Sequence, residues 1–515
     1  MLNRRHFIAG AAATLAAPAI LRAQNGGFAA APFSLGVAAG DPAPDGFVIW
    51  TRLAPEPLDA HGGMAMAPVP VNWEVGTDDQ LRNIVARGSE IARPELAHSV
   101  HVEVAGLQPD RPYWYRFRAG GEGSVIGRGR TLPAAGASPR SLRFGVCGCQ
   151  NYEDGYYAAY RALAEEELAF VYHYGDYIYE GWAGGIHTSH SGDITIPVRH
   201  HVGQRCYDLT DYRRRYAQYK TDPDLQLAHA AQTWFATFDD HEVRDNWGGD
   251  SDTLDTPPEL FRTRRAAAFQ AWYEHMPVRR SLFPRGPSID AYRSARYGDL
   301  VAFDILDTRQ YRTPPPCGDD FAPACPGLTD PHAAMISAEE EAWLARNLAR
   351  PEARWSCVAQ QVMMMALNRQ TGEGPAILNM DSWAGHEVAR RRLLARMRGL
   401  NNVVVLTGDE HQNFAGLLTD PAASGDTPVG VEFVATSISS GGDGSDRRRG
   451  SERILAENPQ LKFINDQRGY ATCEVTPDEW RTDFMVLDRV STPGGRLSKR
   501  ATWAVAHGTV ALHEA

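Results

Sequence analysis

The sequence predicts two folded parts: an N-terminal immunoglobulin-like or fibronectin III-like β-sandwich, and a larger α+β or α/β layered core of β-sheets flanked by helices. Residues 32–135 contain short strand patterns separated by Gly, Pro and Asp turns. A stretch at 133–141, rich in Pro and Ala, has the composition of a linker. From residue 140 onward, strand patterns alternate with helical ones, which is typical of layered sheets and helices.

In the N-terminal part, strands are expected at 47–52, 71–75 and 101–104. A turn at 107–110 then leads into 113–117, where large aromatic residues recur along the strand. A turn followed by an aromatic strand is typical of immunoglobulin-like sandwiches. The sandwich is therefore assigned to residues 32–135.

The core is assigned to residues 140–490. Its helices are expected at 158–168, 338–349 and 385–399, and its strands at 143–146, 170–172, 234–238, 301–306, 357–359 and 403–406. The last residues, 491–515, are expected to form a C-terminal segment that helps to close the cleft.

The first residues have the features of an export signal. Arg4 and Arg5 precede a short apolar run at 9–20, and small residues follow near 23. The run is too short for a permanent membrane anchor, and the paired arginines favour the twin-arginine export machinery over the general secretory route. We therefore assign residues 1–24 to a twin-arginine-type signal and expect a periplasmic or secreted protein.

The charge balance excludes one class of partner. The chain of 515 residues has 52 Lys and Arg against 63 Asp and Glu, a formal net charge of -11. Such a balance gives no general attraction to nucleic acid or to anionic membranes. We expect a monomer with no nucleic-acid-binding surface, in which metal ions supply positive charge wherever a phosphate is bound.

Metal-binding side chains follow four of the predicted strands. Because the carboxyl ends of strands in open sheets meet at one crevice, these side chains are expected to converge. They are Cys149 after the first strand, Asp176 and Tyr179 after the second, Asp240 and Asn246 after the third, and Asp409 and His411 after the last.

The ligand types indicate two kinds of metal. Thiolate, phenolate and imidazole from Cys149, Tyr179 and His411 suit a transition metal, and Fe³⁺ tolerates phenolate well. Carboxylates and an amide suit Ca²⁺ or Mg²⁺. Asp176 lies where it could bridge both ions. Two such cations would generate a hydroxide that attacks phosphorus.

Three further residues are assigned to catalysis. His241 is expected to stabilise charge or to protonate the leaving oxygen. Arg309 and Arg312 suit bidentate contact with phosphate, although a structural ion pair explains them equally well. Asp239 and Asp240 are adjacent and cannot both face the site from an extended backbone, so Asp239 is assigned to loop support.

Three cysteines have roles outside the predicted metal site. Cys317 and Cys325 bracket a loop rich in Pro and Gly, and in an oxidising compartment they are expected to pair as a disulfide. Cys147 is expected to be a buried apolar residue and not a metal ligand.

Four motifs, at 175–180, 239–243, 306–312 and 408–411, resemble those of PhoD-like alkaline phosphatases. The resemblance implies a metallophosphatase core behind an immunoglobulin-like domain, and hydrolysis of small phosphate monoesters and diesters. It implies iron (Fe³⁺) and calcium (Ca²⁺), with Zn²⁺, Mn²⁺ or Mg²⁺ as substitutes. The implied iron ligands are Cys149, Asp176, Tyr179 and His411; the implied calcium ligands are Asp176, Asn246 and Asp409, with Asp240 as a further one.

Two other functions stay open at this point. A phospholipase D-like enzyme of the same superfamily would cleave lipid headgroups and would need an apolar rim. A non-catalytic calcium-binding surface protein would need oxygen ligands only, which the thiol and phenol argue against.

Overall fold

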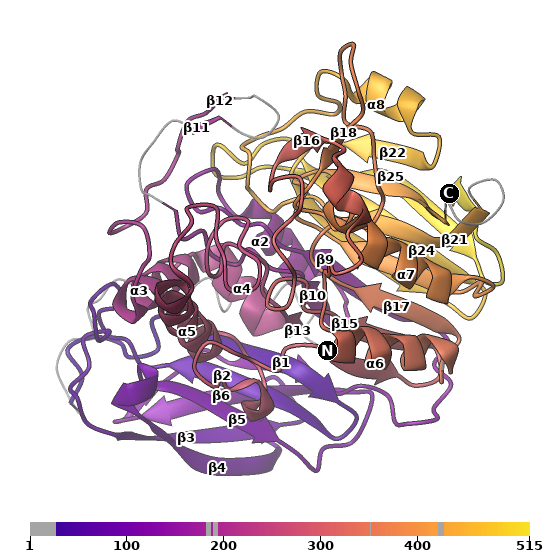
Figure 1. The fold of residues 1–515 in the computed structure, drawn as a ribbon. Coiled ribbons are helices and arrows are strands. Elements are labelled where there is room, and N and C mark those ends of the chain that lie inside the picture. Colours follow the sequence, from indigo (N-terminus) through magenta and orange to yellow (C-terminus); the bar gives the residue numbers. More distant parts are fainter. Residues whose placement is uncertain (1–26, 182–186, 189–193, 351, 421–426) are drawn as a thin grey trace.

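The computed structural model describes residues 27–181, 187–188, 194–350, 352–420 and 427–515 (Figure 1). The predicted export signal at 1–24 lies outside this part of the chain. Within the described residues, no helix combines the length and the apolar character needed to cross a bilayer.

Two large mixed sheets form the centre of the molecule (Figure 1). The ten-stranded sheet has the order β26 (Leu512–Glu514), β25 (Leu497–Ala506), β24 (Glu479–Leu487), β23 (Gly469–Val475), β9 (Leu142–Cys147), β10 (Val171–His173), β13 (Thr233–Ala236), β1 (Val37–Ala43), β2 (Gly46–Arg52) and β5 (Ser99–Val104). The seven-stranded sheet has the order β14 (Arg293–Tyr297), β15 (Val301–Ile305), β17 (Trp355–Ala359), β19 (Val403–Thr407), β21 (Thr427–Val434), β20 (Asn413–Asp420) and β22 (Leu461–Asn465).

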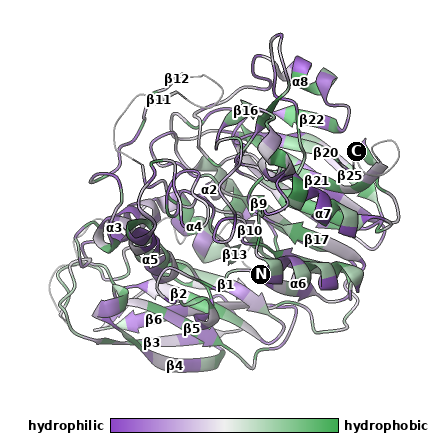
Figure 2. Ribbon diagram, viewed as in Figure 1, coloured by the Kyte–Doolittle hydropathy of each residue, from purple (hydrophilic) through white to green (hydrophobic). Residues whose placement is uncertain are grey.

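Helices cover the outer faces of both sheets. The ten-stranded sheet is covered by α2 (Ala158–Glu165), α3 (Leu209–Lys220), α4 (Pro223–Ala231) and α5 (Pro258–His275), and the seven-stranded sheet by α6 (Ala338–Ala349), α7 (Glu387–Met397) and α8 (Ser451–Glu457). Figure 2 shows the hydrophobic residues of central strands such as β17 and β21, and the mixed character of the outer helices. The predicted layered core is confirmed.

Aromatic rings hold the two sheets together. Phe303 of β15 meets Phe144 of β9, Phe170 and Phe235 of β13, with ring centroids 5.8, 5.4 and 5.8 Å apart. All four side chains are buried. Such contacts combine apolar burial with favourable ring geometry, so they fix the spacing between the strand ends of the two sheets.

A third sheet lies on the N-terminal strands. It contains β4 (Ile84–Ala92), β3 (Val69–Gly76), β6 (Pro112–Ala119) and β7 (Glu122–Gly123), and β8 (Gly127–Arg130) also pairs with β6. It packs on β1, β2 and β5 through a core of Val, Phe and Tyr residues. The N-terminal part is thus a two-layer β structure.

One layer of this structure continues into the core. Strand β1 pairs with β13 in parallel, with Ala39 opposite Thr233 and Gly40 opposite Trp234. The 32–135 and 140–490 parts therefore share the ten-stranded sheet, although the sequence between them reads as a linker. Strand patterns report which face is buried and not which strand is the neighbour, so this junction was not predicted.

The C-terminal segment also joins this sheet. Residues 497–506 pair with β24 as β25, and β26 completes the edge. Ser491, at the start of the 491–515 segment, lines the pocket described below. Most of the segment extends the sheet.

Two short strand pairs complete the described fold. They are β11 (His187–Thr188) with β12 (Ile194–Thr195), and β16 (Phe321–Pro323) with β18 (Ile377–Asn379). The predicted disulfide between Cys317 and Cys325 is present and closes the loop that carries β16.

Gly40→Ala is expected to loosen the junction between the two parts. A Cβ at residue 40 would lie 2.1 Å from the carbonyl oxygen of Pro277 and 2.8 Å from that of Trp234. Overpacking of this kind costs about 1–3 kcal/mol, so the melting temperature should fall by several degrees. Gly123→Ala is the control, because a Cβ at Gly123 meets nothing within 4 Å. Equal melting temperatures for the two variants would contradict this account of β1.

Candidate metal centre

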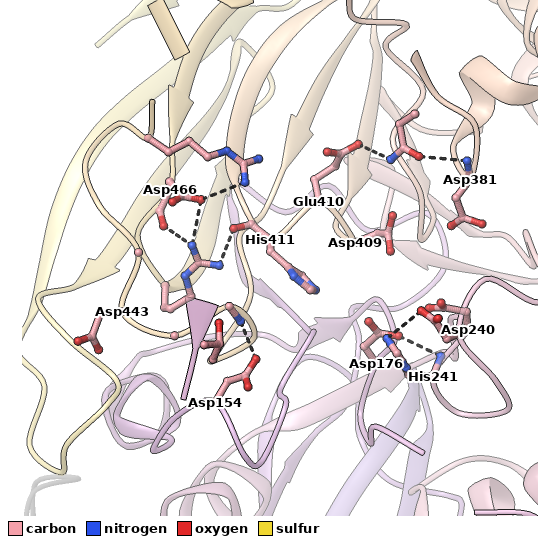
Figure 3. A pocket seen from close by; sticks show the side chains of 18 of the residues that line it. Asp154, Asp176, Asp240, His241, Asp381, Asp409, Glu410, His411, Asp443 and Asp466 are labelled. Carbon is pink, nitrogen blue, oxygen red and sulfur yellow. Dashed lines mark hydrogen bonds and ion pairs between the residues drawn. The ribbon is translucent and has the colours of Figure 1, made fainter. Parts of the chain in front are cut away.

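The four predicted strand ends meet at one edge of the two sheets. Strands β9, β10 and β13 run parallel in one sheet, and β19 belongs to the facing sheet. A pocket of about 560 Å³ opens there (Figure 3). Asp176, Asp240, Asp409 and His411 line it together with Asn246.

The first group of side chains surrounds one oxygen of Asp176. Cys149 Sγ lies 3.4 Å from Asp176 Oδ2, and the Tyr179 hydroxyl lies 3.0 Å from the same oxygen. The Tyr179 hydroxyl is also 3.1 Å from His411 Nε2. A thiol, a phenol, an imidazole and a carboxylate are therefore within reach of one ion, as predicted for a transition metal.

The second group consists of carboxylates. Ligand oxygens of Asp176, Asp239, Asp240 and Asp409 lie within 4.8 Å of one another. Asp176 also belongs to a cluster with Cys149 and His411, and to one with Asp240 and His241. Asp176 thus belongs to all three groups of potential ligands, and its predicted bridging role remains a prediction.

Asn246 borders the carboxylate group. Its backbone N–H donates to Asp240 Oδ2 at 2.7 Å, and its side-chain amide donates to the carbonyl of Asp319 at 2.7 Å. The side-chain amide oxygen is the atom that a hard cation would use.

The charges of this cluster fit bound cations. Asp239 Oδ2 and Asp240 Oδ1 are buried and have no hydrogen-bond partner among the described residues. Burial and neighbouring carboxylates raise the pKa of Asp176 and of Asp409 well above the usual range, and burial raises the pKa of the Cys149 thiol. A buried carboxylate oxygen without a donor is costly, and a cation between these oxygens removes that cost.

The candidate ligands have unusual backbone conformations. Left-handed φ angles occur at Cys149 (49°), Asp176 (56°), Asn246 (54°), Asp409 (67°) and His411 (53°). Non-glycine residues seldom adopt this region, and such strain clusters at functional sites. The turns after these strands therefore hold the candidate ligands in place at an energetic cost.

Glu242 holds the strained turn at Asp176. Its buried carboxylate accepts hydrogen bonds from the backbone N–H groups of Asp176 (3.0 Å), Tyr177 (2.7 Å) and Asp239 (2.9 Å). Burial raises the pKa of Glu242 to about 8, although these three donors oppose the shift. Sequence reasoning missed Glu242, whose position beside His241 was its only signal.

His241 lies at the edge of the centre with one ring nitrogen engaged. Its Nδ1 is 2.8 Å from Glu180 Oε2, and its ring stacks on Tyr179 at a centroid distance of 3.9 Å. Burial lowers the pKa of His241, but Asp240, Asp176 and Glu180 raise it well above the usual range. Its Nε2 lies on the side of Asp245, 3.7 Å from Oδ1.

Arg309 and Arg312 lie behind the pocket and are buried. Arg309 contacts Asp239 through Nε, and its Nη1 donates to Asp381 Oδ1 at 2.9 Å. Arg312 also contacts Asp381. The structure places these two arginines in ion pairs, the alternative that the sequence left open. Asp381, their shared partner, was not predicted because its role depends on contacts with the distant residues Arg309 and Arg312.

Ser440 is a further residue that the sequence did not assign. Its hydroxyl lies 2.7 Å from the Tyr179 hydroxyl and 2.7 Å from the carbonyl of Cys149. It therefore orients the phenol toward Asp176. The run of Ser and Gly at 439–444 indicated a loop but not this contact.

Comparison with known proteins places this site in a family. Residues 144–484 match the profile of the PhoD-like phosphatases, and residues 19–133 match the N-terminal domain of the same family. The chain belongs to the PhoD-like phosphatase family. Alkaline phosphatase D of Bacillus subtilis (strain 168) is 46% identical to it over 479 residues, which are 92% of this chain and 81% of that protein.

Solved structures agree with this assignment. A structure of PhoD has a TM-score of 0.91 to this PhoD-like phosphatase at 44% identity, covering 95% of this chain and 93% of that one. The purple acid phosphatase PPD1 from yellow lupin (Lupinus luteus) has a TM-score of 0.53 at 12% identity. The match covers 91% of this chain and 74% of that one. The second likeness shows a shared fold.

Removal of bound metal by a chelator is expected to lower the melting temperature more at about pH 8.5 than at about pH 5. Burial and neighbouring carboxylates raise the pKa of Asp239 to about 6 and raise that of Asp176 well above its usual range. When a carboxyl group has a higher pKa in the folded than in the unfolded protein, the free energy of unfolding falls as pH rises from the unfolded-state pKa through the folded-state pKa. Cations remove this loss, so melting curves with and without chelator should separate as pH increases. If the difference in melting temperature between the metal-bound and the chelator-treated protein became smaller as pH rises, the result would contradict cation binding by the carboxylate cluster.

Proposed function

We propose that this PhoD-like phosphatase is an exported alkaline phosphatase and phosphodiesterase, a phosphoric ester hydrolase that acts on small monoesters and diesters. In this proposal Cys149, Asp176, Tyr179 and His411 hold Fe³⁺, and Asp176, Asn246, Asp409 and Asp240 hold Ca²⁺. The single observation that carries it is the position of Asp176, which is shared by three clusters of candidate ligands. Bound cations would polarise the phosphoryl oxygens and lower the pKa of a water molecule.

The side chains around the cluster supply the remaining roles. His241, oriented by Glu180 through Nδ1, directs Nε2 toward the pocket and donates a proton to the leaving oxygen. Arg309 keeps Asp239 charged, and its Nη2 lies 3.6 Å from Asp240 Oδ1 and 3.9 Å from Asp409 Oδ1. Together with Arg312, it holds the carboxylates that face the phosphate.

The pocket favours soluble esters over lipid headgroups. Carboxylates dominate its lining, and Ile196 is its one strongly exposed aliphatic residue among the described ones, with 66% exposure. An apolar rim large enough for a lipid surface would need more such residues. The phospholipase D-like function is therefore the second candidate.

The disulfide supports a location outside the cytoplasm. Cys317 and Cys325 are paired near residues 319–321, which line the pocket. Disulfides persist mainly in oxidising compartments. Together with the twin-arginine pattern at Arg4 and Arg5, this supports a periplasmic or secreted protein.

Cys149→Ser is expected to lower iron content and to lower kcat/KM for p-nitrophenyl phosphate at least about 100-fold, because a lost metal ligand costs at least as much as a lost outer-shell contact. Cys147→Ser is the matched control, since Cys147 is a buried thiol two residues away in a different hydrophobic cluster. Metal analysis and turnover of p-nitrophenyl and bis-p-nitrophenyl phosphate measure both effects. Calcium without iron, and no hydrolysis of either ester by the unmodified protein, would favour the calcium-binding surface protein instead.

His241→Asn is expected to affect poor leaving groups most. A general acid contributes about 10²–10⁴-fold to a rate, and an alkyl alcohol needs the proton more than p-nitrophenol does. The kcat for an alkyl phosphate should fall about 100-fold or more, and that for p-nitrophenyl phosphate much less. His200→Asn is the control, because the His200 side chain is 70% exposed. Equal losses for both esters would argue against proton donation by His241.

A further inference from the structure

The pocket continues past His411, away from the carboxylate cluster. Figure 3 shows Asp443 and Asp466 on one side of His411, and Asp240 and Asp381 on the other. We call the first side the far wall; the residues that line it include 441–445, Arg448, Asp466 and Arg468. A pocket of about 560 Å³ has the size of sites for whole small molecules, so it has room for more than one phosphoryl group.

The two arginines of the far wall have different partners. Arg468 is 2% exposed, and its Nη1 donates to the carbonyls of His411 and Ser440, each at 2.7 Å. Its Nη2 donates to Asp466 Oδ1 at 3.1 Å. Both terminal nitrogens of Arg468 therefore hold the end of the His411 turn and the loop beside it, and its Nε is buried.

Arg448 is only partly used. Its Nη2 donates to Gln412 Oε1, and its closest carboxylate oxygen, Asp466 Oδ1, is 4.0 Å from Nη1, beyond hydrogen-bond distance. By contrast, Arg309, Arg369 and Arg468 each have a carboxylate within 3.1 Å. The Arg448 side chain is 22% exposed and lines the pocket. Burial lowers its pKa to about 10, so it stays cationic at neutral pH.

The carboxylates of the far wall already have donors. Asp443 accepts the backbone N–H groups of Val490 and Ser491 at 2.6 and 2.7 Å and the Ser491 hydroxyl at 2.7 Å. Asp466 is held by Arg468. Since these anions are engaged by the protein, Arg448 is the arginine of the far wall that can meet a ligand, and it does so at the end of the pocket away from His241.

We propose that Arg448 forms a subsite for a second anionic group, so that the preferred substrates are phosphate esters whose leaving alcohol itself carries a phosphate. The inference rests on the proposed function. With the reacting phosphoryl group at the carboxylate cluster, the alcohol extends along the pocket past His411. A second phosphate there would accept from Arg448 Nη1 or Nε, because Nη2 already donates to Gln412, and a hydrogen bond between guanidinium and phosphate is strengthened by charge.

Two esters of one alcohol test this proposal: 1,3-propanediol bisphosphate and 3-hydroxypropyl phosphate, compared by phosphate release. Arg448→Gln is expected to lower kcat/KM for the bisphosphate about tenfold more than for the monophosphate, mainly through KM, because a charged hydrogen bond is lost. Arg448→Lys, which keeps the charge without the planar fork, should lose less of this preference.

Arg447→Gln is the matched control. Arg447 is the neighbouring residue, pairs with Glu452, and is absent from the pocket lining, so the ratio of the two substrates should stay at the wild-type value. An Arg448→Gln variant that loses both activities equally, or that keeps the wild-type ratio, would overturn the subsite. If the wild-type protein hydrolyses neither ester, the proposed function fails, and the subsite fails with it. Hydrolysis of 3-hydroxypropyl phosphate by each variant shows that its active site is assembled.

Discussion

The arrangement of this site depends on a single carboxylate. Asp176 contacts Cys149 and Tyr179 through one oxygen, and the backbone N–H of His241 lies 3.3 Å from the other. It is buried among other acids, which makes its charge unfavourable without a cation. The need to hold the Asp176 carboxylate at this position explains the strained turn at Asp176. It also explains why Glu242 accepts hydrogen bonds from that turn. The metal centre is thus a place where the fold gives up stability in order to gather ligands.

Ion pairs between arginines and aspartates at the back of the pocket limit the stability that is lost by burying these acids. Arg309 and Arg312 share Asp381, and Arg309 also contacts Asp239. Removing one member of a buried pair leaves an uncompensated charge, which costs more than the pair itself contributes. Asp239 and Asp381 therefore have fixed counter-charges at the back of the pocket.

The sequence indicated which polar side chains follow the strands. It did not indicate which residues from distant loops those side chains contact. Cys149, Asp176, Asp240 and Asp409 could be predicted because each follows an apolar strand, and strands of one layer end at a common edge. The helix at 338–349 was predicted with its observed bounds, since Ser337 accepts from the N–H of Glu340 as a helix cap. Asp381, Ser440 and Glu242 escaped prediction because their roles depend on contacts between distant loops. The left-handed turns also leave no pattern, because the ligands that adopt them are ordinary Cys, Asp, Asn and His residues.

The order of strands in the ten-stranded sheet has a consequence for how the protein is made. Strand β9, which leads to Cys149, lies between β10 and β23, and β23 comes from residues 469–475. On its other side, β13 receives β1 from the beginning of the chain. Sheets built from such distant segments form slowly, since large loops must close before the contacts stabilise them. A chain that ended between residues 411 and 469 would carry every proposed metal ligand and still lack β23, which borders the strand that leads to the first of them. Completion of the centre is therefore tied to synthesis of the whole polypeptide, although the last hundred residues contribute none of its ligands.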